Sequence, residues 1–200
     1  MKYCSDCGSE VELRVPEGDD HPRYVCGTCA TIHYQNPKLV VGCIPEWEDK
    51  ILLCRRAIEP RYGLWTLPAG FMENDETTQQ GAARETLEEA CARVEVGRLY
   101  SLFNLPHINQ VYLVFRSRLL DLDFGPSRES LEVRLFREHE VPWQEIAFPV
   151  IRETLGLYFR DRTQGEFELR TGDIVRLEGG VRRYRVSIHG DRAETRIQAA

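Results

Sequence analysis

Residues 70–92 read GFMENDETTQQGAARETLEEACA, and this stretch indicates how the chain around it folds. Its second half predicts a helix on which Glu85, Glu88 and Glu89 share one face, because successive helical residues turn by about 100°. The segment 77–80 fits a capping box at the start of this helix. The opposite face is expected to be a buried apolar stripe that consists of Ala83, Leu87 and Ala90.

The carboxylate cluster on this helix predicts a cation site. Like charges at this spacing destabilise a helix by roughly 0.2–0.5 kcal/mol per pair, and negative charge is disfavoured near a helix C-terminus. A solvated acidic face is the alternative interpretation, but a surface selected for stability would avoid this arrangement. A hard divalent cation, Mg²⁺ or Mn²⁺, reverses both costs because it prefers carboxylate oxygens. The preceding segment, 63–70, reads as a loop with turn residues at both ends, so a loop and an acidic helix together form the predicted site.

The spacing of charged residues resembles the Nudix box of the Nudix hydrolases. Gly70 is followed after five residues by Glu76, and after seven more by Arg84-Glu85-x-x-Glu88-Glu89. The charged skeleton of the family pattern is complete. The chain departs from it at Thr86 in place of an aliphatic residue, Cys91 in place of glycine, and Ala92 as a weakly apolar end. None of these three would be a metal ligand, and a small cysteine is expected to fit where glycine allows close packing.

The resemblance implies the chemistry and the roles of these residues. It implies hydrolysis of a nucleoside diphosphate linked to another group, by attack of water at phosphorus, with Mg²⁺ or Mn²⁺ as the cofactor. Glu85 and Glu89 would be the principal metal ligands, and Glu88 a further ligand or the residue that orients the water. The remaining implied roles are a carbonyl ligand from Ala69 or Gly70, and an ion pair of Arg84 with Glu76 that holds the loop on the helix.

A further carboxylate from a later loop often completes such sites. Residues 130–136 resemble the strand on which many Nudix enzymes carry it, so Glu132 is the first candidate and Glu129 the second. A solvated loop acid is the alternative interpretation of either residue.

Cys4, Cys7, Cys26 and Cys29 form the pattern C-x2-C-x18-C-x2-C, which predicts a Zn²⁺ site. Four thiolates fill a tetrahedral site and leave no position for substrate, so the zinc is expected to be structural. A disulfide framework or a redox pair is the alternative. The other cysteines, Cys43, Cys54 and Cys91, are expected to be small buried residues.

The ribbon and several segments after it resemble the zinc-ribbon Nudix group that includes plant FAD and ADP-ribose pyrophosphatases. This resemblance covers roughly residues 1–165 and implies FAD or ADP-ribose as substrate, with release of AMP. An NADH or NAD pyrophosphatase is the alternative, but residues 101–109 lack the Ser-Gln-Pro-Trp-Pro-Phe segment that marks NADH pyrophosphatases. The substrate-contacting candidates are Phe103, Pro106 and Tyr112, with Trp143 as a further ring and His107 on a candidate substrate loop. For each of the aromatic residues, a place in the core is the more common outcome.

Composition limits the other function classes. The chain has 200 residues and a net charge of −6, which argues against non-specific nucleic-acid binding. A non-catalytic nucleotide sensor or a nucleic-acid module remains the alternative of another class. The first residues, MKYCSDC, lack the apolar region of a signal peptide, and apolar runs such as 39–44 are too short to span a bilayer. A cytoplasmic protein with a small nucleotide substrate and no membrane partner is therefore expected.

The expected organisation is a zinc ribbon over residues 1–35, a Nudix hydrolase domain over 36–162 and a β-rich extension over 163–200. Strands are predicted at 38–45, 50–56, 94–103, 110–120 and 131–137, and a helix starts at Pro149. This order indicates an α/β sandwich, and the resemblance implies a mixed sheet between helices. In the extension, strands are expected at 167–170, 174–178 and 181–188, with a hairpin at Gly179-Gly180. These strands are expected to cover the domain or to form the contact of a homodimer.

Overall fold

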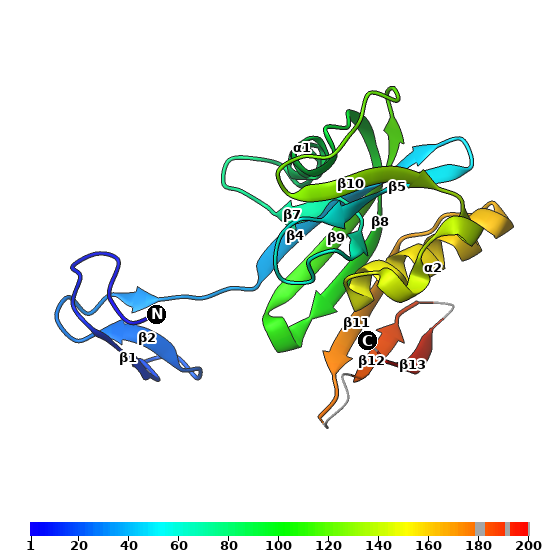
Figure 1. Cartoon of the computed structure of the whole chain (residues 1–200). Coiled ribbons are helices and arrows are strands. Elements are labelled where there is room, and N and C mark those ends of the chain that lie inside the picture. Colours follow the sequence, from blue (N-terminus) through cyan, green and yellow to red (C-terminus); the bar gives the residue numbers. More distant parts are fainter. Residues whose placement is uncertain (179–182, 191–192, 200) are drawn as a thin grey trace. The chain divides into compact units, whose positions relative to one another are not determined.

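The computed structural model of the protein describes residues 1–178, 183–190 and 193–199 (Figure 1). The chain forms two compact units, Met1–Pro37 and Lys38–Ala200, which we call the small unit and the large unit. The small unit is an antiparallel sheet in the order β1-β2-β3, made of β1 (Val11–Arg14), β2 (Arg23–Cys26) and β3 (Ile32–His33).

The large unit is built on one ten-stranded mixed sheet. Eight strands follow the order β10-β5-β4-β9-β8-β11-β12-β13, while β6 pairs with β5 and β7 pairs with β4. The β4–β9 and β8–β11 pairs are parallel and the other pairs antiparallel. The strands are β4 (Lys38–Trp47), β5 (Lys50–Arg56), β6 (Trp65–Thr66), β7 (Ala69–Phe71), β8 (Val94–Leu105), β9 (Gln110–Leu119), β10 (Ser130–Phe136), β11 (Arg170–Arg176), β12 (Arg183–Ile188) and β13 (Glu194–Ala199). The helices are α1 (Thr78–Ala90) and α2 (Pro149–Gln164), with short 3₁₀ turns η1 (Pro106–Ile108), η2 (Glu138–Glu140) and η3 (Trp143–Glu145).

Alternation of side chains along the central strands places the two helices on opposite faces of the sheet. On β5, Ile51 and Leu53 point into the core that contains Leu155 of α2, whereas Leu52 and Cys54 point into a cluster with Ala90 of α1. The predicted α/β sandwich with a mixed sheet between helices is thus confirmed. The five strands expected before residue 140 match β4, β5, β8, β9 and β10 to within a few residues.

Helix α1 starts as predicted but buries a different face. Thr77 is its N-cap and forms a capping box with Gln80. The expected buried stripe is wrong at Leu87, whose side chain is 51% exposed, while Glu85 and Glu89 are buried. The acidic side of the helix therefore faces the body of the large unit. The reason is that this side lines a pocket, described below.

The C-terminus of α1 corrects the expectation for Cys91. This residue is exposed, rather than buried, and adopts the left-handed conformation with φ 50° and ψ 22°. Glycine is the residue most often found in this conformation at the end of a helix. The glycine of the family pattern is thus explained here by backbone geometry and not by close packing. Cys43 and Cys54 are buried, as expected.

The C-terminal strands extend the same sheet rather than forming a separate layer. Strand β11 pairs in parallel with β8, and Arg170 at its start donates two hydrogen bonds to Asp161 of α2, at 2.9 and 2.6 Å. The strand expected at 167–170 is absent, because Phe167 packs its ring against Tyr100 from an irregular segment. The hairpin expected at Gly179-Gly180 lies outside the described residues.

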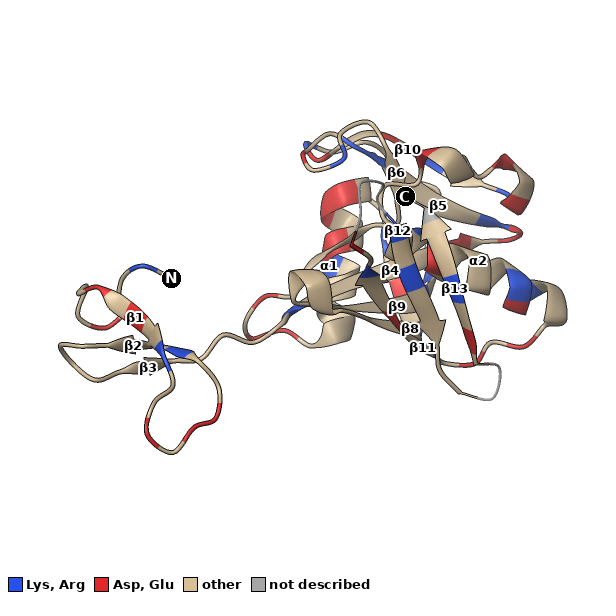
Figure 2. Ribbon diagram, turned by 90° about the horizontal axis from the view of Figure 1, so that it is seen from below, with Lys and Arg blue, Asp and Glu red and all other residues tan. Residues whose placement is uncertain are grey.

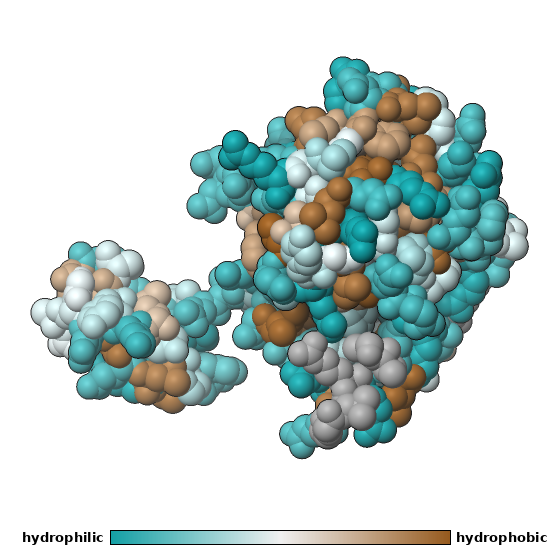
Figure 3. Space-filling view, in the orientation of Figure 1, coloured by the Kyte–Doolittle hydropathy of each residue, from teal (hydrophilic) through white to brown (hydrophobic). Residues whose placement is uncertain are grey.

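On the face shown in Figure 3, the apolar side chains of the large unit lie in patches between hydrophilic ones. In the described part of the chain, no helix has the length and apolar character needed to cross a membrane.

Candidate active site

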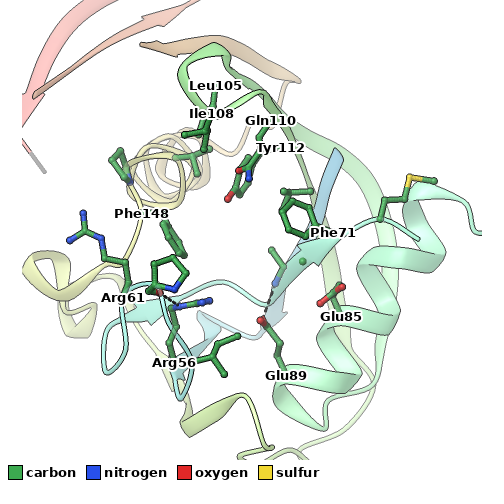
Figure 4. Close-up of a pocket in the computed structure, with 18 of the residues that line it drawn as sticks. Arg56, Arg61, Phe71, Glu85, Glu89, Leu105, Ile108, Gln110, Tyr112 and Phe148 are labelled. Atoms are coloured by element: carbon green, nitrogen blue, oxygen red, sulfur yellow. Dashed lines mark hydrogen bonds between the residues drawn. The ribbon is translucent and has the colours of Figure 1, made fainter. Parts of the chain in front are cut away.

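The acidic side of α1 borders a pocket of about 840 Å³ in the large unit. Its walls come from the loop after β5, from β7, from α1, from η1 and β9, from the start of α2, and from β11 and β12. Figure 4 shows Glu85 and Glu89 on one side of it, Arg56 and Phe148 on another, and Leu105 and Ile108 at the far end. Segments distant in sequence thus meet around one cavity.

Glu89 is the most deeply buried carboxylate of the pocket. Its side chain is 5% exposed, and one oxygen accepts a hydrogen bond of 3.0 Å from the backbone N–H of Ala69. Burial raises the pKa of Glu89 to about 8, although the Ala69 hydrogen bond acts in the opposite direction. Burial also raises the pKa of Glu85, which is 9% exposed. Two buried carboxylates with raised pKa values are a favourable place for a cation.

The loop approaches the carboxylate of Glu85 closely at Gly70. A Cβ atom added to Gly70 would lie 2.2 Å from a carboxylate oxygen of Glu85. Strand β7, which contains Gly70 and Ala69, is held in place by antiparallel pairing with β4. The backbone of Gly70 and the carboxylate of Glu85 are therefore neighbours in the folded chain, as the sequence predicts for residues of one site.

Arg84 connects the loop to the helix. It donates to both oxygens of Glu76, at 3.0 and 2.8 Å, so the ion pair expected between them is present. These hydrogen bonds hold the pKa of Glu76 at about 2. The same guanidinium donates to Glu85 at 2.7 Å and to Glu88 at 3.0 Å. Arg84 therefore fixes the position of three carboxylates.

The acidic residues group on α1, as Figure 2 shows in red. Glu88 borders the pocket, but its side chain is 55% exposed. Among the described residues, Glu85, Glu88 and Glu89 do not bring one oxygen each within 4.8 Å of the others. Glu85 and Glu89 are the buried pair, and Glu88 lies toward solvent.

The two candidates for the additional carboxylate lie in different places. Glu129 lines the pocket, and its charge contributes to the raised pKa values of Glu85 and Glu89. Glu132, the first candidate, lies outside the pocket lining and is 4.0 Å from Arg55, with its side chain 45% exposed. A bulge between Ser130 and Glu132 shifts the register of β10 against β5. The choice of Glu132 over Glu129 is corrected accordingly.

Of Phe103, Pro106 and Tyr112, Tyr112 is the residue that lines the pocket. Phe103 is fully buried and belongs to the core of the large unit. Pro106 is exposed at the start of η1, outside the pocket lining. Trp143 packs edge-on against Phe159 at the margin of that core. Phe103 and Pro106 therefore lie away from the pocket, and Trp143 belongs to the core margin, which was its alternative interpretation.

Sequence reasoning missed Arg56, which is a prominent cation of the pocket. Its side chain is only 8% exposed; Nε donates to the Pro60 carbonyl at 2.9 Å, and the guanidinium lies 5.1 Å from the ring centre of Phe148. Arg56 lines the pocket, and Figure 4 shows its guanidinium pointing into the cavity. The signal that could have found it is an arginine at the end of a strand predicted to be buried.

Three pocket residues come from the C-terminal strands, for which no function was predicted from the sequence. Ile174 and Arg176 lie on β11 and Tyr184 on β12. His107, a low-ranked candidate, also lines the pocket, and its Nδ1–H donates to the Ile174 carbonyl at 3.1 Å.

The four cysteines of the small unit converge as predicted. Their sulfur atoms all lie within 4.8 Å of one another, with Cys4 to Cys29 at 3.6 Å and Cys7 to Cys26 at 3.5 Å. Disulfide sulfurs are about 2.05 Å apart, so the cysteines are free thiols in this structure. A four-thiol cluster of this kind matches the ligand set of a structural zinc site.

Comparison with family models agrees with this geometry. The NUDIX domain model matches residues 36–156, and a zinc-ribbon model described as Nudix N-terminal matches residues 2–35. The chain belongs to the Nudix hydrolase family. A crystal structure of a NUDIX hydrolase from Nitrosomonas europaea is 64% identical, with a TM-score of 0.86, and the match covers 88% of this chain and 99% of that one.

More distant Nudix relatives carry names that specify substrates. The NAD-capped RNA hydrolase NudC of Photobacterium profundum is 29% identical over 78% of this chain. The chain spans 59% of the length of that relative. The crystal structure of an ADP-ribose pyrophosphatase from Streptococcus suis is 27% identical, with a TM-score of 0.56, over 68% of this chain and 99% of that one.

Proposed function

We propose that the protein hydrolyses the diphosphate linkage of a dinucleotide-type substrate, FAD or ADP-ribose, and releases AMP, with Mg²⁺ or Mn²⁺ as cofactor. The observation that carries this proposal is the pocket itself. The buried carboxylates of Glu85 and Glu89 border the same cavity as the buried cation of Arg56 and the ring of Tyr112. A diphosphate between two organic groups needs this combination of cation site, anion-binding group and apolar surface.

The donor set of the pocket fits a hard divalent cation. Glu85 and Glu89 supply carboxylate oxygens, and the described residues that line the pocket include no cysteine. Oxygen donors without thiolates favour Mg²⁺ or Mn²⁺ over zinc. Glu85 and Glu89 would hold the ion, with Glu88, Glu129 and a carbonyl of Ala69 or Gly70 as further donors. When bound, such an ion neutralises phosphate oxygens and activates water.

Three side chains of the site have different roles in this proposal. Arg56 binds a phosphate oxygen with the N–H groups that Pro60 does not use, as a guanidinium does well. Arg84 lines the pocket but acts through its contacts: it holds Glu76, fixes Glu85 and Glu88, and donates to the Phe71 carbonyl, so its N–H groups are already engaged. Glu88 is the most exposed of the three helix carboxylates and orients the attacking water at the mouth of the pocket.

The choice of substrate rests on sequence likeness. The absence of the Ser-Gln-Pro-Trp-Pro-Phe segment at 101–109 argues against NADH as the main substrate, and the likeness to an ADP-ribose pyrophosphatase supports ADP-ribose. The names of the NudC relatives favour a second candidate, an NAD-type substrate that includes NAD-capped RNA. All of these contain AMP joined through a diphosphate, so the same cleavage applies to each.

We also propose that the small unit binds one structural zinc ion through Cys4, Cys7, Cys26 and Cys29. Four thiolates complete a tetrahedral shell, so this ion would take no part in the hydrolysis. A sheet of this size has too small a core to fold without such a metal.

A kinetic comparison of FAD, ADP-ribose, NADH and NAD with Mg²⁺ or Mn²⁺ tests the substrate proposal, with released mononucleotide as the readout. We expect kcat/KM for FAD or ADP-ribose to exceed that for NADH about tenfold, which corresponds to about 1.4 kcal/mol of transition-state binding. A preference for NADH or NAD would overturn the choice of substrate. A protein that cleaves none of the four would contradict the proposed activity itself.

A further inference from the structure

One wall of the pocket is made by residues beyond the Nudix domain. The family model ends at residue 156, whereas Ile174, Arg176 and Tyr184 on β11 and β12 line the cavity. They do so beside His107 and Ile108 of η1. In Figure 4, Ile108 lies on the opposite side of the pocket from Glu89, with Tyr112 between η1 and Glu85. The C-terminal strands therefore border the end of the pocket that is remote from the carboxylates.

The position of this wall is fixed by several independent contacts. Strand β11 continues the sheet beyond β8 (Figure 1), with Arg170 opposite Ser101 and Asp173 opposite Asn104. A Cβ atom at Gly172 would lie 2.7 Å from the ring of Phe103 and 2.5 Å from the Ser187 carbonyl oxygen, so the strands are in close contact there. Because β11 is a paired strand of the sheet, the wall that it forms is a fixed part of the pocket.

The chemistry of the wall suits a flat aromatic group. The rings of His107 and Tyr184 lie 5.7 Å apart at an angle of 52°, and Ile174 is buried beside them. Burial lowers the pKa of His107, which favours the neutral form of its ring. Arg176 at the end of β11 is exposed and adds a cation at the margin of this wall. The rings and the aliphatic side chain beside it contact another ring well.

We propose that β11, β12 and η1 form a distal subsite that binds a planar heteroaromatic ring of the substrate, with Tyr184 and His107 as its specificity-determining residues. The ring is either the adenine or the isoalloxazine of a dinucleotide. This inference rests on the proposed function, because it assumes that the diphosphate lies beside Glu85, Glu89 and Arg56. It assigns a role in substrate choice to the C-terminal strands.

Measurement of how tightly the protein binds the reaction products tests the subsite without any need for turnover. The dissociation constants of AMP, FMN and ribose 5-phosphate are measured by calorimetry with the full chain. The variants are Tyr184→Leu, Tyr184→Phe and His107→Ala, and Tyr62→Leu is the matched control, since Tyr62 is 57% exposed and outside the pocket lining. His107→Ala removes a ring from exposed η1 and keeps the test valid if Tyr184→Leu fails to fold.

We expect Tyr184→Leu and His107→Ala to weaken the binding of AMP or FMN about tenfold and to leave ribose 5-phosphate within about twofold; tenfold corresponds to about 1.4 kcal/mol. Tyr184→Phe and Tyr62→Leu should bind like the wild type. Weaker AMP binding identifies the ring as adenine, and weaker FMN binding identifies it as isoalloxazine. Unchanged affinities for both, equal loss for ribose 5-phosphate, or no binding of AMP and FMN by the wild type would overturn the proposal. Ring binding without hydrolysis would contradict the proposed function alone.

Discussion

At the scale of single residues, Glu89 illustrates how the site lowers the stability of the folded chain. A carboxylate that is 5% exposed and has one backbone hydrogen bond destabilises the folded chain when it is charged. Arg56 offsets part of this cost at a distance by lowering the pKa of Glu89. A divalent cation at Glu85 and Glu89 would offset the rest, so metal binding and stability should be coupled.

Thermal unfolding of Glu89→Gln with and without Mg²⁺ tests this coupling. Without metal at about pH 9, above the raised pKa of Glu89, the variant should unfold at the same temperature as the wild type or higher, because glutamine keeps the acceptor for the Ala69 N–H and removes the buried charge. Mg²⁺ at 100 times its Kd should stabilise the wild type by about 2.7 kcal/mol, or roughly 5–10 °C. The variant should gain much less.

The matched control for this experiment is Glu95→Gln, which changes a side chain that is 64% exposed. It should show the same Mg²⁺ response as the wild type. An equal gain with Mg²⁺ in Glu89→Gln would mean that Glu89 does not hold the ion.

At the scale of elements, the backbone is strained at Cys91, the residue that caps the C-terminus of α1. Cys91 adopts φ 50°, in the region where a Cβ atom is disfavoured by roughly 1–2 kcal/mol and glycine is not. The chain nevertheless continues into β8 in the register that the sheet requires.

Cys91→Gly should therefore increase the free energy of unfolding by about 0.5–1 kcal/mol, after allowance for the greater freedom of glycine in the unfolded chain. Cys91→Ser keeps the Cβ atom and should leave stability unchanged. Denaturant titration of both variants measures the difference. A destabilised glycine variant would contradict the assigned backbone strain.

The contact between α2 and β11 is the second feature at this scale. Arg170 and Asp161 form a two-hydrogen-bond ion pair in which both side chains are nearly buried, and Tyr100 donates to the same carboxylate at 2.9 Å. Removal of one partner leaves a buried charge without its counter-charge.

Arg170→Ala should lower the free energy of unfolding by about 3–5 kcal/mol. The exposed pair Arg118–Glu95 provides the control, since Arg118→Ala should cost less than about 1 kcal/mol. Equal losses in chemical denaturation would show that the buried pair does not anchor β11.

At the scale of the whole molecule, local sequence patterns predicted the helices and strands. The site, in contrast, depends on how the chain topology brings distant residues together. The capping box at Thr77 and the β-branched runs of the strands act within a few residues, so they can be found in the sequence. The buried side of α1 was predicted wrongly because burial of apolar residues is the usual rule, and a functional site breaks it at Glu85 and Glu89. Arg56 and Tyr184 are far apart in the chain, and no periodicity indicates that they share a pocket.

The small unit should behave as a separate metal-dependent module. One equivalent of zinc per chain is expected on metal analysis of purified protein. Cys7→Ser should lower the stability or solubility of the chain far more than the specific activity of the protein that stays folded. Less than about half an equivalent of zinc, with free thiols at Cys4 and Cys26 in folded protein, would argue against the zinc site.

We propose that the protein hydrolyses the diphosphate of a dinucleotide in the pocket that contains Glu89. The most direct measurement is AMP release from ADP-ribose and FAD at saturating Mg²⁺, by the wild type, Glu89→Gln and Glu95→Gln. We expect AMP from the wild type and from Glu95→Gln at similar rates, and a loss of about 100-fold or more in Glu89→Gln, which is about 2.7 kcal/mol of transition-state stabilisation. Absence of AMP with the wild type, or equal turnover in Glu89→Gln, would contradict it.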